Sequence, residues 1–273
     1  GALLRNFVKF DDEPRSAESL VETMLRVNQA IRTAPCGPAY VCLDAGLQEK
    51  PLDDELLIPD LDRFKVAAAP EPPAASVEQA ADMLVGASRV VIMAGRVKRS
   101  RAGWDARVRL AELLGAGVAT DIKTGAAFPT DHKLHLAPPM NRLRDEAVAA
   151  VKECDVILDL NWVDLAGTFK LAVGRGGPNA KVIRVSMEPY IHNGWTMDHM
   201  GLPISDLQVL CETEEFVDRL LPAVERRLGG TSRWDGKNKG READEAKSLK
   251  DMDAGGKISP EALTIGISEA RGK

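Results

Sequence analysis

Short runs of apolar residues, each bounded by turn-forming residues, recur through the middle of the chain. The clearest runs cover Arg89–Gly95, Gly115–Thr120, Asp155–Leu160 and Lys181–Ser186. Stretches with helical spacing lie between them, such as the amphipathic segment Trp104–Leu114. Strands that are apolar throughout are buried on both faces, which is typical of a parallel sheet with helices on each side. The pattern therefore predicts an α/β fold of Rossmann-like type, with a doubly wound, mainly parallel sheet.

The same pattern continues on both sides of these runs and sets the expected limits of the domain. Ser76, followed three residues later by Gln79, is a capping-box pattern that predicts the start of a helix. Further along we expect a helix near Glu146–Glu153, an apolar strand within Leu207–Cys211 and a helix over Glu214–Leu228. These elements predict a compact central domain over residues 76–229.

Residues 1–52 hold one expected helix and one expected strand. Ser16, together with Ser19, offers an N-cap for a helix over Ser16–Ile31, and Gly37-Pro38 introduces a strand at Ala39–Leu43. Because one helix and one strand bury too little surface to fold alone, we expect them to dock elsewhere. The chain opens at Gly1 without a methionine, in a pattern already under way. We therefore expect it to be an excised piece of a longer polypeptide.

Composition marks the remaining segments. Residues 53–75 are rich in Pro and Asp, which predicts an extended, semi-rigid linker. Residues 230–257 are charged and glycine-rich, which predicts a flexible linker. In residues 258–273, Pro260 suits the first turn of a helix.

Charge and composition exclude several classes of partner. The net charge is −5, and no basic stripe with interleaved aromatic residues is present, so we expect no nucleic-acid binding. No apolar stretch reaches membrane-spanning length, so we expect no membrane partner. Cys42, Cys154 and Cys211 lie in apolar runs, as buried thiols do in reducing compartments. The cysteines therefore favour a cytoplasmic protein.

Candidate ligand-binding residues follow the expected strands, because parallel sheets bind ligands at the carboxyl ends of their strands. The segment Gly95–Arg101 places four cations beside one strand end. It is either a solvated loop or an anion site for a nucleotide diphosphate or a carboxylated substrate, paired with Arg and Lys. Trp162 and Asp164 follow another strand, where they either line a pocket or serve packing.

Two other motifs favour ordinary structure. Gly174–Gly177 resembles a phosphate loop, but no helix follows directly, so we interpret it as a connection from helix to strand. His132 and His135 have a spacing found in zinc pairs, yet no suitably spaced cysteine or carboxylate completes a site, and His192 and His199 add little. We expect no metal site here, and we interpret Asp131-His132 as a turn that fixes the loop after the second strand.

Several motifs, taken in order, carry a family resemblance. They are Gly37–Asp44, the Pro-rich linker, Val90–Gly95, Trp104–Gly115, Phe128–His132, Cys154–Leu158 and Val182–Val185. With them, residues 1 to about 229 resemble the central portion of thiamine diphosphate-dependent enzymes of the acetolactate synthase and benzoylformate decarboxylase group. The resemblance implies a parent enzyme that cleaves or forms a carbon–carbon bond on a 2-oxo acid, with thiamine diphosphate and Mg²⁺.

The resemblance also implies a division into domains. Residues 1–52 correspond to the end of the pyrimidine-binding domain, residues 76–229 to the central domain, and residues 258–273 to the start of the pyrophosphate-binding domain. The family's activating glutamate then lies upstream of Gly1, and its Gly-Asp-Gly…Asn motif downstream of Lys273, since Asp253–Gly256 lacks that pattern. The resemblance thus implies a homodimer or homotetramer, and a fragment without catalytic residues that acts as structure.

In relatives that carry a flavin or nucleotide, the central domain is where it binds. The resemblance assigns such a site here to Gly95, Arg96, Ser186 and Glu188, although Ser186 stands where relatives have an acidic residue. Leu136–Asn141 replaces the family's Gly-Met-His-Gly turn, and its prolines lack N–H groups for a phosphate. The alternative function is a free-standing Rossmann-like module that binds FAD, NAD or ADP.

Overall fold

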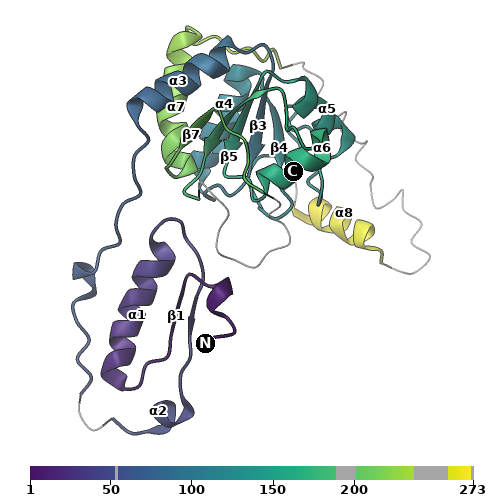
Figure 1. Ribbon diagram of the computed structural model, residues 1–273. Helices are drawn as coiled ribbons and strands as arrows, with labels where there is room; N and C mark the ends of the chain where they lie inside the picture. The colour runs from purple at the N-terminus through teal and green to yellow at the C-terminus, as the bar shows by residue number, and fades with distance from the viewer. Residues whose placement is uncertain (53–54, 189–200, 237–257, 272–273) are drawn as a thin grey trace.

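A computed structural model describes residues 1–52, 55–188, 201–236 and 258–271 (Figure 1). Within those residues, the central part alternates helices with parallel strands. The helices are α3 (Ala74–Gly86), α4 (Arg101–Leu114), α5 (Asp145–Glu153), α6 (Leu165–Val173) and α7 (Thr213–Arg227). The strands are β3 (Val90–Ala94), β4 (Gly117–Thr120), β5 (Val156–Leu160), β6 (Lys181–Val185) and β7 (Leu207–Val209). Each expected apolar run thus contains a strand.

These strands form one sheet in the order β4-β3-β5-β6-β7, and all neighbours pair in parallel. Numbered from β3, the order is 2-1-3-4-5, one of the two common arrangements of doubly wound sheets. The predicted fold class, an α/β fold with a parallel sheet, is confirmed.

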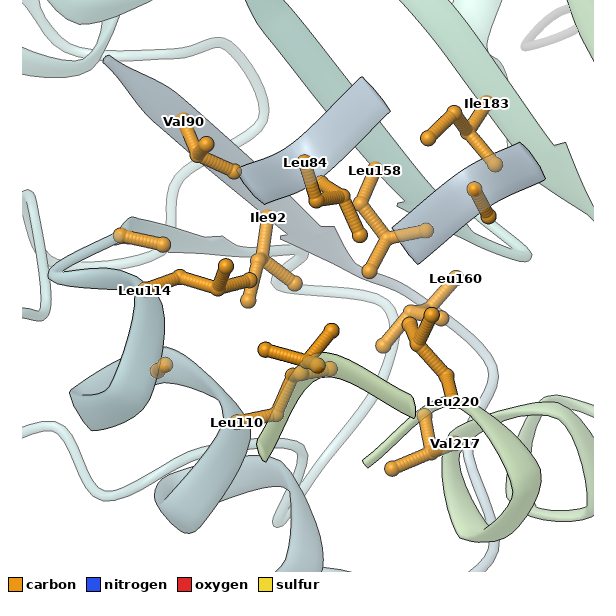
Figure 2. Packing of buried hydrophobic residues seen from close by; sticks show 14 of the residues in the cluster. Leu84, Val90, Ile92, Leu110, Leu114, Leu158, Leu160, Ile183, Val217 and Leu220 are labelled. Carbon is orange, nitrogen blue, oxygen red and sulfur yellow. The ribbon is translucent and has the colours of Figure 1, made fainter. Parts of the chain in front are cut away.

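Helices cover both faces of the sheet, as the continuous apolar runs require. Every residue of β3 and β5 is buried, and alternate residues point to opposite faces. Ile92, Leu158 and Leu160 pack with residues of α3, α4 and α7, including Leu84, Leu110 and Leu220 (Figure 2). On the other face, residues such as Met93 and Ile157 pack with Val151 of α5 and Phe169 of α6. Both layers of core therefore depend on the same two strands.

Strand β4 lies at the edge of the sheet, and the loop that follows it forms backbone hydrogen bonds with that edge. Val118 donates its N–H to the Leu134 carbonyl at 2.8 Å and accepts from the Leu136 N–H at 2.9 Å. His132 closes a turn to Pro129, and its ring Nδ1 accepts from the Leu134 N–H at 3.1 Å. The interpretation of Asp131-His132 as a turn that fixes this loop is confirmed.

Helix starts agree with the sequence in some places and not in others. The capping box expected at Ser76 is wrong, because α3 begins at Ala74 and no side chain caps it. Pro73 takes the N-cap position, and its carbonyl accepts from the N–H groups of Ser76 and Val77 at 2.9 and 3.1 Å. Because the helix starts two residues before Ser76, Ser76 lies inside its first turn and cannot be the N-cap.

The N-terminal segment contains a second, two-stranded parallel sheet of β1 (Phe10–Asp12) and β2 (Ala39–Val41). Helices α1 (Ala17–Arg32) and α2 (Ala45–Glu49) and the 3-10 helices η1 (Arg5–Phe7) and η2 (Leu61–Arg63) complete it. The expected cap of α1 is confirmed, since Ser16 and Ser19 form a reciprocal capping box. Strand β1 was not predicted, because three residues with a single apolar side chain carry no strand pattern.

The polypeptide after α7 does not leave the central domain at Gly230. Ser232 Oγ donates to the Glu112 carbonyl at 2.6 Å, and Arg233 Nη1 donates to the Ala87 carbonyl at 2.7 Å. Trp234 packs against the His132 ring, with centroids 4.9 Å apart. Residues 232–234 therefore hold the ends of α3 and α4, although composition alone predicted a flexible linker there.

Beyond that point, residues 237–257 of the predicted linker lie outside the described residues. Helix α8 (Pro260–Arg271) then begins at the proline that the sequence indicated. None of the helices that the structure describes has both the length and the apolar character needed to cross a bilayer.

Candidate functional site

The carboxyl ends of β3 and β5 lie where the order of strands in the sheet reverses. The chain leaves β3 toward β4 on one side, whereas β5 pairs with β3 on the other. Loops diverging at such a point usually leave a crevice for a ligand. The segments that border it here are Gly95–Ser100 after β3 and Asn161–Asp164 after β5.

Gly95 lies directly against the loop that follows β5. A Cβ at this position would lie 2.3 Å from the Asn161 carbonyl oxygen and 2.5 Å from Trp162 Cα, so only glycine fits. The Gly95 N–H donates to the Leu160 carbonyl at 3.0 Å, and the Arg96 N–H donates to the Asn161 carbonyl at 2.9 Å. The N–H groups of Gly95 and Arg96 are therefore already used in hydrogen bonds within the protein and are not available to a ligand.

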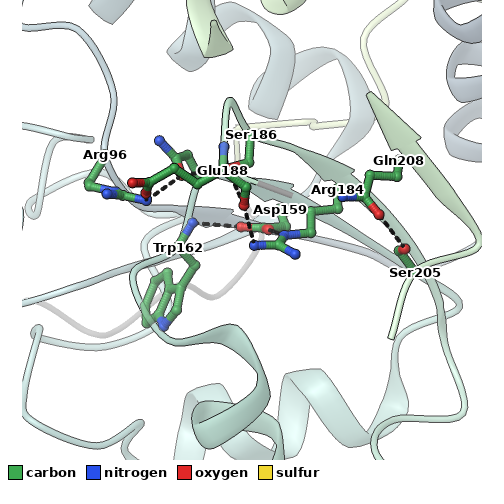
Figure 3. A network of polar contacts seen from close by, with 9 residues as sticks. Arg96, Asp159, Trp162, Arg184, Ser186, Glu188, Ser205 and Gln208 are labelled. Atoms are coloured by element: carbon green, nitrogen blue, oxygen red, sulfur yellow. Dashed lines mark hydrogen bonds and ion pairs between the residues drawn. The ribbon is translucent and has the colours of Figure 1, made fainter. Parts of the chain in front are cut away.

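The other predicted site residues, Arg96, Ser186 and Glu188, lie close to one another beside Asn161 (Figure 3). Arg96 forms an ion pair with Glu188, and its guanidinium donates to Asn161 Oδ1 at 2.9 Å. Ser186, which is buried, donates its hydroxyl to the same Asn161 oxygen at 3.0 Å and accepts from the Glu188 N–H at 2.9 Å. The structure thus brings Gly95, Arg96, Ser186 and Glu188 together, and the side-chain groups bond within the protein.

Asp159 and Arg184 lie below these residues and were not singled out from the sequence. They are register partners on β5 and β6, with Asp159 Oδ2 3.5 Å from Arg184 Nε. Asp159 also accepts the Trp162 N–H at 2.7 Å. Burial away from water raises the pKa of Asp159 to about 7, although the Trp162 N–H and Arg184 act to lower it. Each of these charged residues lies inside an otherwise apolar run, and that position in the sequence could have indicated them.

A second ion pair lies where α4 begins. Glu214 Oε1 accepts from the Lys98 N–H at 2.7 Å and from Arg107 Nη1 at 2.8 Å, while Oε2 accepts from the Thr213 hydroxyl at 2.8 Å. Arg107 also donates from Nε to the Ala127 carbonyl at 2.9 Å. Burial lowers the pKa of Arg107, and the Glu214 carboxylate opposes that shift.

These contacts show how the cationic loop is used. Arg96 pairs with Glu188, Arg101 pairs with Asp105 at 2.9 Å, and the backbone of Lys98 binds Glu214. The contacts favour the interpretation of a surface loop over that of an open anion site. Arg96 and Glu188 also border a cavity of about 320 Å³, which they share with residues 6–9 and 35–38.

The remaining candidates have structural surroundings. Trp162 is buried and donates from Nε1 to Thr168 Oγ1 at 2.8 Å, whereas Asp164 caps α6 through the Gly167 N–H at 2.9 Å. Gly174–Gly177 connects α6 to β6, as expected, with φ of 91° at Gly174 and 72° at Gly177. Their roles are packing, capping and a turn.

The cysteines divide into two groups. Cys154 and Cys211 are buried, and burial raises the pKa of their thiols to about 11 and about 12. Both are core residues, as expected. Cys42 is only half-buried, so its predicted burial was wrong, because β2 lies in a thinly covered sheet.

Metal-binding side chains are not clustered in the part of the chain that the structure describes. Mg²⁺ is held by carboxylate oxygens, and across residues 1–52, 55–188, 201–236 and 258–271 no cluster of three or more His, Cys, Asp or Glu is placed to hold a metal. His192, His199 and Asp253–Gly256, which the sequence raised as weak candidates, lie outside these ranges.

Comparison with known proteins finds similarity over the central part of the chain. Residues 77–194 match the family model described as the central domain of thiamine pyrophosphate enzymes. The probable acetolactate synthase large subunit of Methanocaldococcus jannaschii is 26% identical over 191 residues, which cover 68% of this chain and 32% of that protein.

Solved structures agree in fold. Benzoylformate decarboxylase from Polynucleobacter necessarius superposes with a TM-score of 0.62 at 18% identity, covering 94% of this chain and 44% of that one. A putative thiamin diphosphate-dependent enzyme from Mycobacterium smegmatis gives 0.57 at 20% identity, covering 80% and 39%. The chain thus spans about a third of the curated relative and less than half of these structures.

Proposed function

We propose that residues 77–194 of this chain are the central domain of a thiamine pyrophosphate enzyme, and that the protein is a thiamine diphosphate-dependent enzyme acting on 2-oxo acids. The observation that carries the proposal is the match to the family's central domain. The acetolactate synthase relative supports the same class of substrate. The reaction is the cleavage or formation of a carbon–carbon bond, as a lyase or a transferase. Thiamine diphosphate, held with Mg²⁺, supplies the electron sink for the carbanion.

The role proposed for this chain is structural. The described residues offer no metal cluster, and at the carboxyl edge of the sheet three ion pairs form within the protein, namely Arg96–Glu188, Arg107–Glu214 and Asp159–Arg184. We assign residues 1–52 to the pyrimidine-binding domain, 76–229 to the central domain and 258–273 to the pyrophosphate-binding domain. The central domain then acts as a spacer between two catalytic domains of a cytoplasmic homodimer or homotetramer, and the fragment alone is inactive.

The flanking reading frame tests this proposal most directly. We expect a glutamate-bearing pyrimidine domain before Gly1 and a Gly-Asp-Gly…Asn motif after Lys273. If both are missing, the enzyme assignment is wrong. Where both are present, the longer protein should release CO₂ from pyruvate or benzoylformate, or condense pyruvate, only when thiamine diphosphate and Mg²⁺ are added. The 273-residue chain serves as the matched control, and it should show no turnover under the same conditions.

A free-standing nucleotide module is the second candidate, and the comparisons do not favour it over the enzyme domain. Its prediction concerns Gly95, Arg96, Ser186 and Glu188 as a nucleotide site. FAD, NAD or ADP at a hundredfold over its dissociation constant should then stabilise the chain by about 2.7 kcal/mol. Absence of a shift in the melting temperature with all three ligands would reject that module.

A further inference from the structure

The N-terminus of α4 is the position at which a doubly wound sheet of this order would receive a phosphate. The helix has 14 residues, and it follows β3, the first strand of the domain. Its first N–H groups and its dipole both favour an anion at this end. Ser100 caps one of these groups by accepting the Gly103 N–H at 3.2 Å.

A carboxylate from a distant helix occupies this position. Glu214 lies in the first turn of α7, and its side chain crosses to accept the Lys98 N–H of the loop between β3 and α4. A Cβ at Gly103 would lie 3.2 Å from Glu214 Cγ and 3.1 Å from Arg107 Nη1. Both charged side chains are therefore packed against the first turn of α4.

Arg107 gives the position an anion-binding character that does not depend on the helix end. Its side chain is only 4% exposed, so its positive charge is removed from water. Nη1 binds Glu214, whereas Nη2 is buried without a hydrogen-bond partner among the described residues. A buried guanidinium requires a counter-anion, and it has capacity for one with more acceptor oxygens than the carboxylate supplies.

We propose that the Glu214 carboxylate is a built-in anion that fills the phosphate position of the central domain, and that this side chain excludes phosphate-bearing ligands from the α4 N-terminus. The site it fills is specific for a tetrahedral oxyanion, bound by Arg107, the Lys98 N–H and the first turn of α4. Truncation of Glu214 at Cβ removes four heavy atoms, which frees a space close to that of inorganic phosphate. The inference does not depend on the proposed catalytic function.

The test compares four forms of the full chain: wild type, Glu214→Ala, Glu215→Ala and the double variant Arg107→Met/Glu214→Ala. Glu215 is the matched control, because it removes the same charge from the next residue of α7, where the side chain is exposed. Thermal unfolding is measured with increasing inorganic phosphate, and sodium chloride keeps the ionic strength constant.

Phosphate at a hundredfold over its dissociation constant should raise the melting temperature of Glu214→Ala by about 5–10 °C, with saturation. Wild type, Glu215→Ala and the double variant should shift by less than about 2 °C. An equal shift in Glu214→Ala and Glu215→Ala would overturn the proposal, and so would a shift that survives the loss of Arg107.

Refolding covers the case in which Glu214→Ala does not fold in chloride. The unfolded variant is diluted from denaturant into phosphate or into chloride of equal ionic strength, and native circular dichroism is measured. Recovery in phosphate alone supports an anion site at α4. Failure to recover in either salt contradicts it, because phosphate then does not replace the carboxylate.

Discussion

The central domain and the N-terminal segment both consist of a parallel sheet with helices, but they differ in how completely the helices bury the strands. In the central sheet, β3 and β5 are buried along their whole length between two layers of helices. In the N-terminal segment, β1 and β2 are half-buried throughout, and α1 buries only Thr23. Its apolar face instead lines an open groove of about 790 Å³ with residues of the 58–66 segment.

The difference shows what a sheet needs in order to be stable without further partners. A strand contributes fully only when elements cover both of its faces, since each large apolar side chain removed from water contributes about 1.5–3 kcal/mol. The central domain has that second layer and the N-terminal segment does not. Apolar side chains such as Met24, Ile58 and Leu61 remain about half exposed or more. The following variants test that contrast.

The largest expected effect comes from breaking the buried ion pair of the central domain. Arg107→Met leaves the Glu214 carboxylate nearly buried without its cation, and the free energy of unfolding should fall by about 3–5 kcal/mol in urea titrations. The exposed pair Arg101–Asp105 is the control, and Arg101→Ala should cost less than about 0.5 kcal/mol. Equal losses would mean that burial does not govern these pairs.

Truncation of a core side chain in the central sheet should have the next largest effect. Leu158 is fully buried in β5, so Leu158→Ala should lower the free energy of unfolding by about 2–5 kcal/mol. Met24→Ala in α1 removes a side chain that is about half exposed, and should cost less than about 1 kcal/mol. Hydrogen exchange at β5 and α1 measures each change locally. A loss in α1 as large as that in β5 would contradict the contrast.

The two regions should also respond to pH in opposite directions. Burial raises the pKa of Asp159 to about 7, so between pH 4 and 7 the folded chain keeps a proton that the unfolded chain has lost. Stability contributed by this group is present below pH 4 and is lost as pH rises through 7, by at most about 1.4 kcal/mol per pH unit. Urea titrations across this range should show the slope, and Asp159→Asn should remove it.

Asp12 of the N-terminal segment provides the opposite sign. The Thr23 hydroxyl, at 2.6 Å, and the Glu13 N–H lower the pKa of Asp12. Its contribution is present above the ordinary pKa and is lost as pH falls through the lowered value. Protection factors of the β1 amides, which are corrected for the intrinsic pH dependence of exchange, should therefore fall in acid, and Asp12→Asn should weaken that response. The same direction of pH response in both regions would contradict this account.

The smallest effect concerns helix capping. Ser16→Ala removes the reciprocal cap of α1 and should lower its local stability by about 1 kcal/mol, measured by hydrogen exchange along the helix. Ser76→Ala is the matched control, because Ser76 has a capping-box sequence but lies inside the first turn of α3. It should change stability by less than about 0.5 kcal/mol. A comparable cost at Ser76 would restore the cap that its sequence suggested.

Local patterns predicted much of the central domain. Continuous apolar runs located β3, β5 and β6, because burial on both faces leaves no polar alternation. The three-residue strand β1 was missed, since it is too short to carry a pattern. At the candidate site, Gly95, Arg96, Ser186 and Glu188 lie close together, and their role as a nucleotide site stays a prediction. Asp159, Arg184, Arg107 and Glu214 were not found, although they are central to its electrostatics.

By itself, the sequence determined which segments become strands and helices and that the sheet is parallel, because hydrophobic period and turn residues act over a few neighbouring positions. Only the tertiary structure decided where the charges go. Arg107 and Glu214 are 107 residues apart, and they meet because α7 packs against α4 on one face of the sheet. A local pattern carries no information on such pairing, since it depends on which distant helices pack side by side.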